Sequence, residues 1–220
     1  MLYATGNKGK IMEVGKLLEK YGIEVVSPKD LGMEMAESSS QTRFDSVLET
    51  GKTLEDNAAI KARAFRIKAK EIVIMADDTG LEIDALGGEP GIKPRRWRDG
   101  VTEMSEEEIV NYCLERMQRI PPEARGARLR TVVGLIFPGS DEIEYFDGRL
   151  RGLILQEPKG EPSPGLPFET LFYVPEWEMT LKEVRDLPED KKIEYLTHRE
   201  MAIEKAVPRI LEWFARREES

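Results

Sequence analysis

Ile72-Val73-Ile74-Met75-Ala76, followed directly by Asp77-Asp78-Thr79-Gly80, is the stretch of this sequence that decides its fold. The first part is an apolar run typical of a buried strand, and α/β proteins place polar chemistry at the ends of such strands. Successive side chains of a strand point to opposite faces, so we expect one aspartate to face a cleft and the other to brace the loop. We assign the functional role to Asp78. An Asp-Gly turn with two solvated acids is the alternative, because turns favour the same residue types.

The composition argues against a general nucleic-acid-binding protein. The 220 residues include 33 Lys and Arg against 42 Asp and Glu, which gives a formal net charge of −9. An anionic ligand would therefore need a local basic pocket. No stretch approaches the about 20 apolar residues of a membrane helix, and the start of the sequence lacks the pattern of a signal peptide. We expect a cytoplasmic protein that binds no membrane, in which the single Cys113 is a small core residue.

Helical and strand-like patterns alternate along the chain. Strands are predicted at residues 1–5, 23–26, 72–76, 129–137, 143–146, 150–155 and 168–174. Helices are predicted at residues 11–21, 54–70, 106–119 and 200–217. Turns or loops are predicted at residues 38–41, 138–139, 147–148 and 159–167. This order predicts an α/β fold with a mixed central sheet and flanking helices, in which residues 1–220 form one domain of two lobes.

The first predicted strand leads into Gly6-Asn7-Lys8-Gly9-Lys10, which precedes a helix. Such a loop exposes backbone N–H groups and the positive end of the helix dipole, both of which suit a phosphate. Lys8 and Lys10 would add charge, and Asn7 would add an amide contact. The spacing matches neither the P-loop nor the GxGxxG dinucleotide motif. An ordinary tight turn is the alternative.

A second polar cluster, Glu55-Asp56-Asn57, lies at the start of the next predicted helix. The two acids either complement the helix dipole or supply a Mg²⁺ ligand opposite Asp78, because carboxylate oxygens suit this cation. In the second case Asn57 and Lys61 would support the metal site or reach a phosphate.

Two further segments carry charge. Lys93-Pro94-Arg95-Arg96-Trp97-Arg98 places a basic cluster beside an aromatic ring, which suits a phosphate or a base, although a solvated basic loop is the alternative. The sole histidine, His198, precedes Arg199 at the start of the last predicted helix. This pair either reads the polar edge of a base or is structural.

Five of these segments together resemble, in order and rough spacing, the inosine triphosphate pyrophosphatase family. They are Ala4–Lys10, Gly51–Ala58, Ala76–Leu81, Leu86–Ile92 and Thr197–Arg199. The resemblance implies hydrolysis of aberrant purine nucleoside triphosphates such as ITP, XTP and dITP to the monophosphate and pyrophosphate. It also implies a Mg²⁺ cofactor and a two-lobed α/β homodimer with the substrate in a cleft between the lobes.

The resemblance further implies roles for individual residues. Asp78 would be the metal ligand or the base for the attacking water, Lys10 would neutralise the leaving pyrophosphate, and Asp56 would be a second metal ligand. The implied or candidate substrate contacts are Thr5, Asn7, Lys8, Asn57, Thr79, Arg96, Phe168, Glu169, His198 and Arg199.

The sequence departs from the family pattern at Asp56, where the family commonly has glutamate and the adjacent Glu55 is a possible substitute. It also departs at Lys192, which lies one position off the expected lysine, and in one loop. The family usually has Gly-Phe-Gly-Tyr-Asp-Pro where this chain has Gly165-Leu166-Pro167-Phe168-Glu169-Thr170. Phe168 could still stack on a base and Glu169 keeps a carboxylate, but Pro167 removes a backbone donor. The base specificity therefore stays open. A divergent protein that binds nucleotides with altered specificity or without turnover is the alternative function.

Overall fold

A computed structural model describes residues 1–33 and 50–218, so the loop predicted at residues 38–41 lies outside the described residues. The chain divides into two compact units. Unit 1 comprises Met1–Asp78, Thr131–Gly148 and Arg199–Ser220, and unit 2 comprises Thr79–Arg130 and Arg149–His198.

The strands form one mixed sheet, as predicted, with the order β1-β2-β4-β5-β6-β7 and with β3 paired to β2. Their bounds are Leu2–Tyr3 (β1), Ile74–Ile83 (β2), Pro90–Gly91 (β3), Gly126–Ile136 (β4), Glu144–Ile154 (β5), Phe172–Val174 (β6) and Met179–Thr180 (β7). β1 runs parallel to β2, with Leu2 opposite Ile74, whereas β6 pairs antiparallel with both β5 and β7. Strands β2, β4 and β5 contribute residues to both units.

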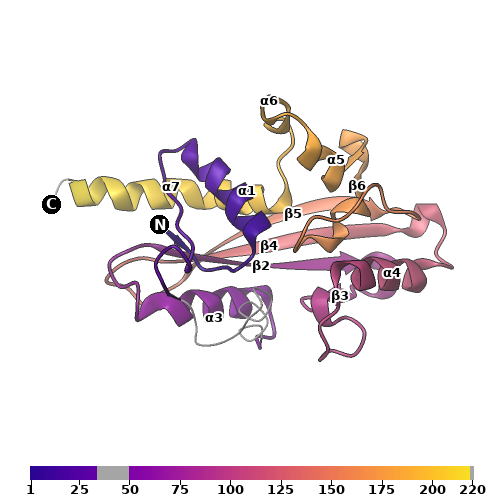
Figure 1. Ribbon diagram of the computed structural model, residues 1–220, viewed down its shortest axis with the longest axis horizontal. Helices are drawn as coiled ribbons and strands as arrows, with labels where there is room; N and C mark the ends of the chain where they lie inside the picture. Colours follow the sequence, from indigo (N-terminus) through magenta and orange to yellow (C-terminus); the bar gives the residue numbers. More distant parts are fainter. Residues whose placement is uncertain (34–49, 219–220) are drawn as a thin grey trace. The chain divides into compact units, whose positions relative to one another are not determined.

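Helices cover both faces of the sheet in unit 1 (Figure 1). α1 (Lys8–Glu19) and α7 (His198–Glu218) pack on one face, and α3 (Leu54–Arg66) packs on the other. The residues of β2 and of the segment just before it alternate between the two cores. Val73 and Met75 belong to the core under α1 and α7, whereas Ile74 and Ala76 belong to the core under α3. The flanking helices predicted from the sequence are therefore confirmed, and the alternation sets the directions of the next two residues, Asp77 and Asp78.

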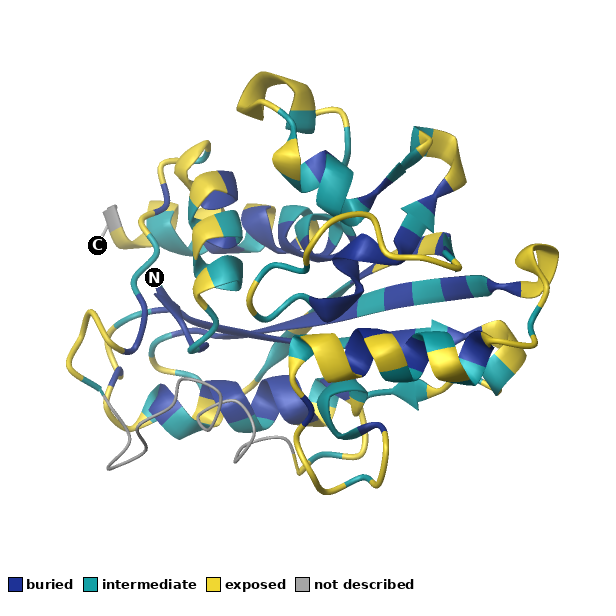
Figure 2. Ribbon diagram, turned by 45° about the vertical axis from the view of Figure 1, so that its right-hand side comes forward, coloured by how far each residue is buried: buried dark blue, intermediate teal, exposed yellow. Residues whose placement is uncertain are grey.

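Unit 2 contains α4 (Glu106–Met117), α5 (Leu181–Asp186) and α6 (Glu189–Lys192). α4 begins at a capping box between Ser105 and Glu108, and it buries Cys113, which the sequence predicts to be a core residue. Figure 2 shows buried and exposed residues alternating along the helices, as expected for helices that pack through one face. Among the described residues, no helix combines the length and the apolar character needed to cross a membrane.

Three predicted boundaries are wrong. β2 does not end at Asp77 but continues through both aspartates to Ile83, where Leu81 pairs with Gly91 of β3. β5 likewise runs without interruption through the predicted turn at residues 147–148. In both cases pairing with neighbouring strands outweighs the local preference of Asp and Gly for turns. The strand predicted from Phe168 begins only at Phe172, because Pro167–Thr170 forms a short 3-10 turn.

The predicted helices agree with the structure except at their ends. The first helix begins at Lys8 instead of Ile11, and the second ends at Arg66 instead of Lys70. The strand predicted at residues 23–26 is reduced to a single bridge between Val26 and Leu2.

Candidate active site

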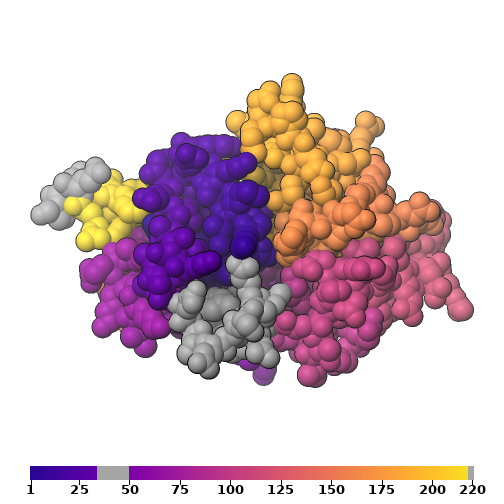
Figure 3. Space-filling model, in the orientation of Figure 1, coloured from indigo at the N-terminus to yellow at the C-terminus, as the bar shows by residue number. Residues whose placement is uncertain are grey.

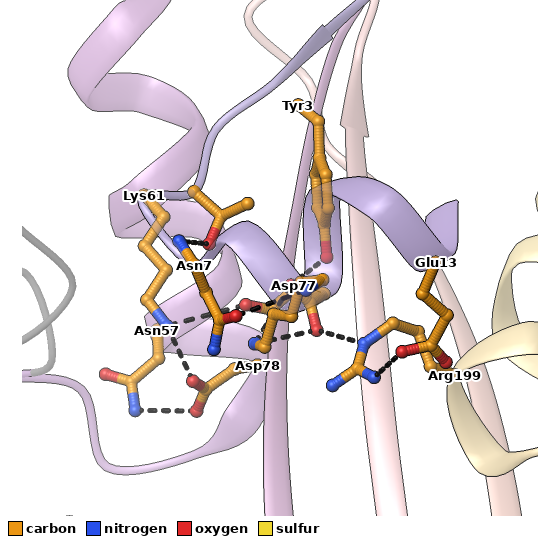
Figure 4. Close-up of polar contacts among 10 residues, drawn as sticks. Tyr3, Asn7, Glu13, Asn57, Lys61, Asp77, Asp78 and Arg199 are labelled. Carbon is orange, nitrogen blue, oxygen red and sulfur yellow. Dashed lines mark hydrogen bonds and ion pairs between the residues drawn. The ribbon is translucent and has the colours of Figure 1, made fainter. Parts of the chain in front are cut away.

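Asp78 lies on the α3 side of the sheet in unit 1 and is held there by two side chains of that helix (Figure 4). Lys61 Nζ lies 2.8 Å from Asp78 Oδ1, and Asn57 Nδ2 donates to Asp78 Oδ2 at 2.9 Å. Asn57 Oδ1 accepts a hydrogen bond from the backbone N–H of Gly51 at 2.8 Å, which fixes the orientation of the amide. All three side chains are buried, so Asp78 is a carboxylate with a defined orientation in a low-dielectric environment.

Asp77 lies on the opposite face and joins β1, β2, α1 and α7 (Figure 4). Tyr3 Oη donates to Asp77 Oδ1 at 2.6 Å, and Lys10 Nζ lies 3.2 Å from Oδ1 and 3.0 Å from Oδ2. Arg199 Nε donates to Oδ2 at 3.2 Å, and Arg199 Nη1 donates to Glu13 Oε2 at 2.9 Å. This network, Tyr3, Lys10, Glu13, Asp77 and Arg199, places two anions and two cations beside a tyrosine in the interior of unit 1.

The electrostatics fix the protonation state of this network. Burial alone would raise the pKa of Asp77, but Lys10, Arg199 and Lys61 together hold it well below its usual range. Burial and the charge of Asp77 raise the pKa of the Tyr3 phenol well above its ordinary value. Asp77 is thus ionised and Tyr3 protonated at neutral pH. This state suits a structural role for Asp77 and not proton transfer. The arrangement agrees with the structural role assigned to one aspartate of the pair, and the catalytic role of Asp78 stays a prediction.

The predicted phosphate loop forms the start of α1. Asn7 is the helix cap, since its Oδ1 accepts from the backbone N–H of Lys10 at 3.1 Å. The backbone N–H of Asn7 in turn donates to Oγ1 of the buried Thr5 at 3.2 Å. Lys8 is exposed in the first turn, and the N-terminal segment reaches the surface (Figure 3). Backbone N–H groups at a helix start suit an anion, so this geometry is compatible with the predicted phosphate contacts.

The second predicted metal ligand, Asp56, is exposed, and its Oδ2 accepts from the backbone N–H of Lys52 at 3.1 Å. That contact serves the start of α3, where an acid also complements the helix dipole. Within residues 1–33 and 50–218, no three acidic, histidine or cysteine side chains form a cluster suited to a metal ion. The assignment of Asp56 as a metal ligand therefore stays a prediction.

The candidate base contacts Phe168, Glu169 and Arg96 in unit 2 each contact other side chains of the protein. Phe168 is only 7% exposed, and its ring centroid lies 6.4 Å from that of Trp97, and its contact with a base stays a prediction. Glu169 Oε2 accepts from Arg185 Nε at 2.7 Å. Arg96 Nη2 lies 3.4 Å from Glu103 Oε1.

Two other predicted substrate contacts differ in burial. Thr79 is half-buried in β2, whereas His198 is buried at the start of α7. Both roles stay predictions.

Sequence reasoning missed three contributions. Sequence reasoning assigned Lys61 only a supporting role. Its spacing of four residues from Asn57 was the available signal, because it places both side chains on the helix face beside Asp78. The parts played by Tyr3 and Glu13 have no local signal in the sequence, because their partners lie 74 and 186 residues away.

Fold and site define an α/β protein in which buried cations hold two adjacent carboxylates of a central strand. The described fold resembles the Ham1 protein of Staphylococcus aureus with a TM-score of 0.69 at 27% identity, covering 99% of this chain and 98% of that one. A HAM1 protein from Coxiella burnetii gives a TM-score of 0.70 at 27% identity, covering 96% and 98%.

This chain belongs to the Ham1 family, whose family model matches residues 1–209. A dITP/XTP pyrophosphatase of Yersinia pseudotuberculosis is 35% identical over 185 residues, 84% of this chain and 86% of the relative. The Bacillus cereus protein of the same name is 32% identical over 215 residues, which cover 97% of this chain and 96% of the relative. The family resemblance inferred from the five segments is confirmed.

Proposed function

We propose that this protein hydrolyses noncanonical purine nucleoside triphosphates such as dITP, XTP and ITP to the monophosphate and pyrophosphate. The observation that carries the proposal is the similarity, over 84 to 97% of the chain, to proteins named dITP/XTP pyrophosphatase. The reaction would remove aberrant nucleotides from the nucleotide pool.

Within unit 1, we propose that Asp78 positions or deprotonates the water that attacks the α-phosphorus. Lys61 and Asn57 fix the direction of both oxygens of Asp78, which supports this role because a base must be held in a defined orientation. The positive charge of Lys61 compensates the buried negative charge of Asp78.

Lys10 is proposed to neutralise charge on the leaving pyrophosphate. Its ammonium group lies against both oxygens of Asp77, an arrangement that holds the long side chain at the start of α1. Asn7 and Thr5 shape the same helix start, where backbone N–H groups add donors for phosphate oxygens. A preorganised cation is more effective than a mobile one because it does not reorganise during the reaction.

We propose that a divalent cation, Mg²⁺, is held by carboxylates of the site together with the substrate. Mg²⁺ is usually bound through one or two carboxylates together with substrate phosphates and water. Asp78 offers one such carboxylate, Glu55 or Asp56 would offer a second, and the triphosphate would complete the coordination. When bound, the cation would supply further neutralisation of the phosphates.

For the purine we keep the predicted contacts Arg96, His198 and Arg199 as proposals, and Thr79 is kept as a substrate contact. Arg199 is held by Asp77 and Glu13, so any contact with a base would have to involve the rest of its guanidinium. Discrimination against ATP would arise from unmet hydrogen bonds, since each buried polar group left unpaired costs about 1–3 kcal/mol.

The test is release of pyrophosphate from a panel of ITP, XTP, dITP, GTP and ATP with Mg²⁺. We expect turnover of the first three nucleotides and little turnover of ATP. Measurable binding without release from any nucleotide would contradict the proposed hydrolysis and leave nucleotide binding as the function. We also propose that the protein is a homodimer and acts in the cytoplasm. Light scattering would test the dimer by measuring the mass of the particle.

A further inference from the structure

The segment Ser163–Thr170, which we call the Pro167 loop, is held by the carboxylate of its own Glu169 and by that of Glu106 in α4. Glu169 Oε1 accepts from the backbone N–H of Ser163 at 2.6 Å. Glu106 Oε1 accepts from the backbone N–H of Gly165 at 2.9 Å. Within the loop, the backbone N–H of Leu166 donates to the carbonyl of Ser163 at 2.9 Å. The loop therefore has a defined shape that does not depend on a ligand.

Glu106 connects this loop to the basic segment Lys93–Arg98. The oxygen that accepts from Gly165 also lies 3.1 Å from Arg95 Nη2. Glu106 itself is the first residue of α4, so one carboxylate oxygen joins a helix start, a basic segment and a loop. Burial alone would raise the pKa of Glu106, but backbone N–H groups and Arg95 lower it below the ordinary value. The link is therefore ionised at neutral pH.

Packing beside the link supports the same connection. Trp97 follows Arg95 and Arg96 in the basic segment, and its ring meets both Tyr112 of α4, at a centroid distance of 5.3 Å, and Phe168 of the loop. Gly165 has a φ of 84°, a conformation that only glycine adopts without strain, so its N–H is directed by the backbone. Shifting the carboxylate would thus move the basic segment and the Pro167 loop relative to one another.

We propose that Glu106 is a positioning residue for base selectivity, because it sets the distance between the basic segment with Arg96 and the Pro167 loop. This inference rests on the proposed function, in which Arg96 contacts the purine, and on the family resemblance, which aligns the Pro167 loop with the Gly-Phe-Gly-Tyr-Asp-Pro loop. Glu106 acts through these two segments and does not itself touch the substrate.

The first experiment measures the link without any nucleotide. Amide hydrogen exchange of Gly165 in the full-length protein is expected to rise about tenfold in Glu106→Ala, the loss expected for a hydrogen bond to a charged acceptor. Glu106→Gln keeps an acceptor oxygen and should stay closer to the wild type. Glu107→Gln, an exposed acid one position along the same helix turn, is the matched control and should leave the exchange unchanged. Unchanged exchange of Gly165 in Glu106→Ala overturns the inference.

The second experiment measures selectivity. In Glu106→Ala, KM for ITP should rise about tenfold with kcat within about twofold, and the preference for ITP over ATP in kcat/KM should fall by a similar factor. Glu107→Gln should show neither change. The inference is overturned if Glu106→Ala lowers kcat alone. It is also overturned if the preference for ITP over ATP is unchanged although the amide of Gly165 exchanges faster. If the wild type binds nucleotides without turnover, the proposed function fails, and dissociation constants for ITP and ATP from calorimetry replace KM in the same comparison.

Discussion

Replacing Asp78 with asparagine is expected to remove activity and also to lower stability, because Asp78 is half of a buried ion pair. Lys61 Nζ lies 2.8 Å from Asp78 Oδ1, and the side chains of Lys61 and Asp78 are only 3% and 5% exposed. An amide at position 78 would present a donor either to Lys61 or to Asn57 Nδ2. Asn57 cannot turn over without losing the hydrogen bond from Gly51 at 2.8 Å. Removing one partner of a buried pair typically costs about 3–5 kcal/mol, and we expect this cost in the free energy of unfolding.

A double variant separates the loss of fold from the loss of chemistry. In Asp78→Asn with Lys61→Met, the buried ammonium is absent, so no uncompensated charge remains. We expect the double variant to be more stable than Asp78→Asn by about 1–3 kcal/mol, since contacting residues couple by this amount. Both variants should lack pyrophosphate release, because neither has the carboxylate. Urea denaturation and the release assay with ITP provide the two measurements.

The matched control is Asp141→Asn. Asp141 is also in unit 1, but its side chain is fully exposed and lies 3.9 Å from Arg66, so its replacement should change stability by less than about 0.5 kcal/mol. An Asp78→Asn variant as stable as the wild type would refute the reasoning about the buried pair. Wild-type turnover in that variant would remove Asp78 from the mechanism.

Three further predictions concern stability. Tyr3→Phe removes the 2.6 Å hydrogen bond to ionised Asp77 and should lower the free energy of unfolding by about 1.5–3 kcal/mol in urea, whereas the exposed Tyr145→Phe should not. Because Asp77 has a lowered pKa in the folded protein, its stabilising contribution is complete above the unfolded pKa of about 3.9 and decreases as the pH falls further. Denaturation at pH 6 and below about pH 4 should show that loss, and a flat profile would contradict it. Thr170→Val should raise the melting temperature, because the buried Thr170 hydroxyl has no hydrogen-bond partner among the described residues; a lower melting temperature would contradict that explanation.

Local patterns predicted most of the secondary structure because they depend on residues close in the chain. The capping box of Ser105 and Glu108, the cap at Thr53 and the apolar period of the first helix are all short-range signals, and all three appear in the structure. The boundaries failed at Asp77 and at residues 147–148, where Asp and Gly indicated turns. Pairing between long strands decided these positions, and strand pairing depends on residues that the local pattern does not contain.

The sequence by itself determined the family, the order of the polar segments and the opposite directions of Asp77 and Asp78, because alternation is a property of any strand. Only the tertiary structure decided which side chains contact each carboxylate. Asp78 received Lys61 and Asn57 from α3, whereas Asp77 received Tyr3 and Lys10 from the start of the chain and Arg199 from its last helix. The reason is that a buried charge must be compensated by whatever cations and donors the packed helices bring to it, and that packing is set by the apolar cores on the two faces of the sheet.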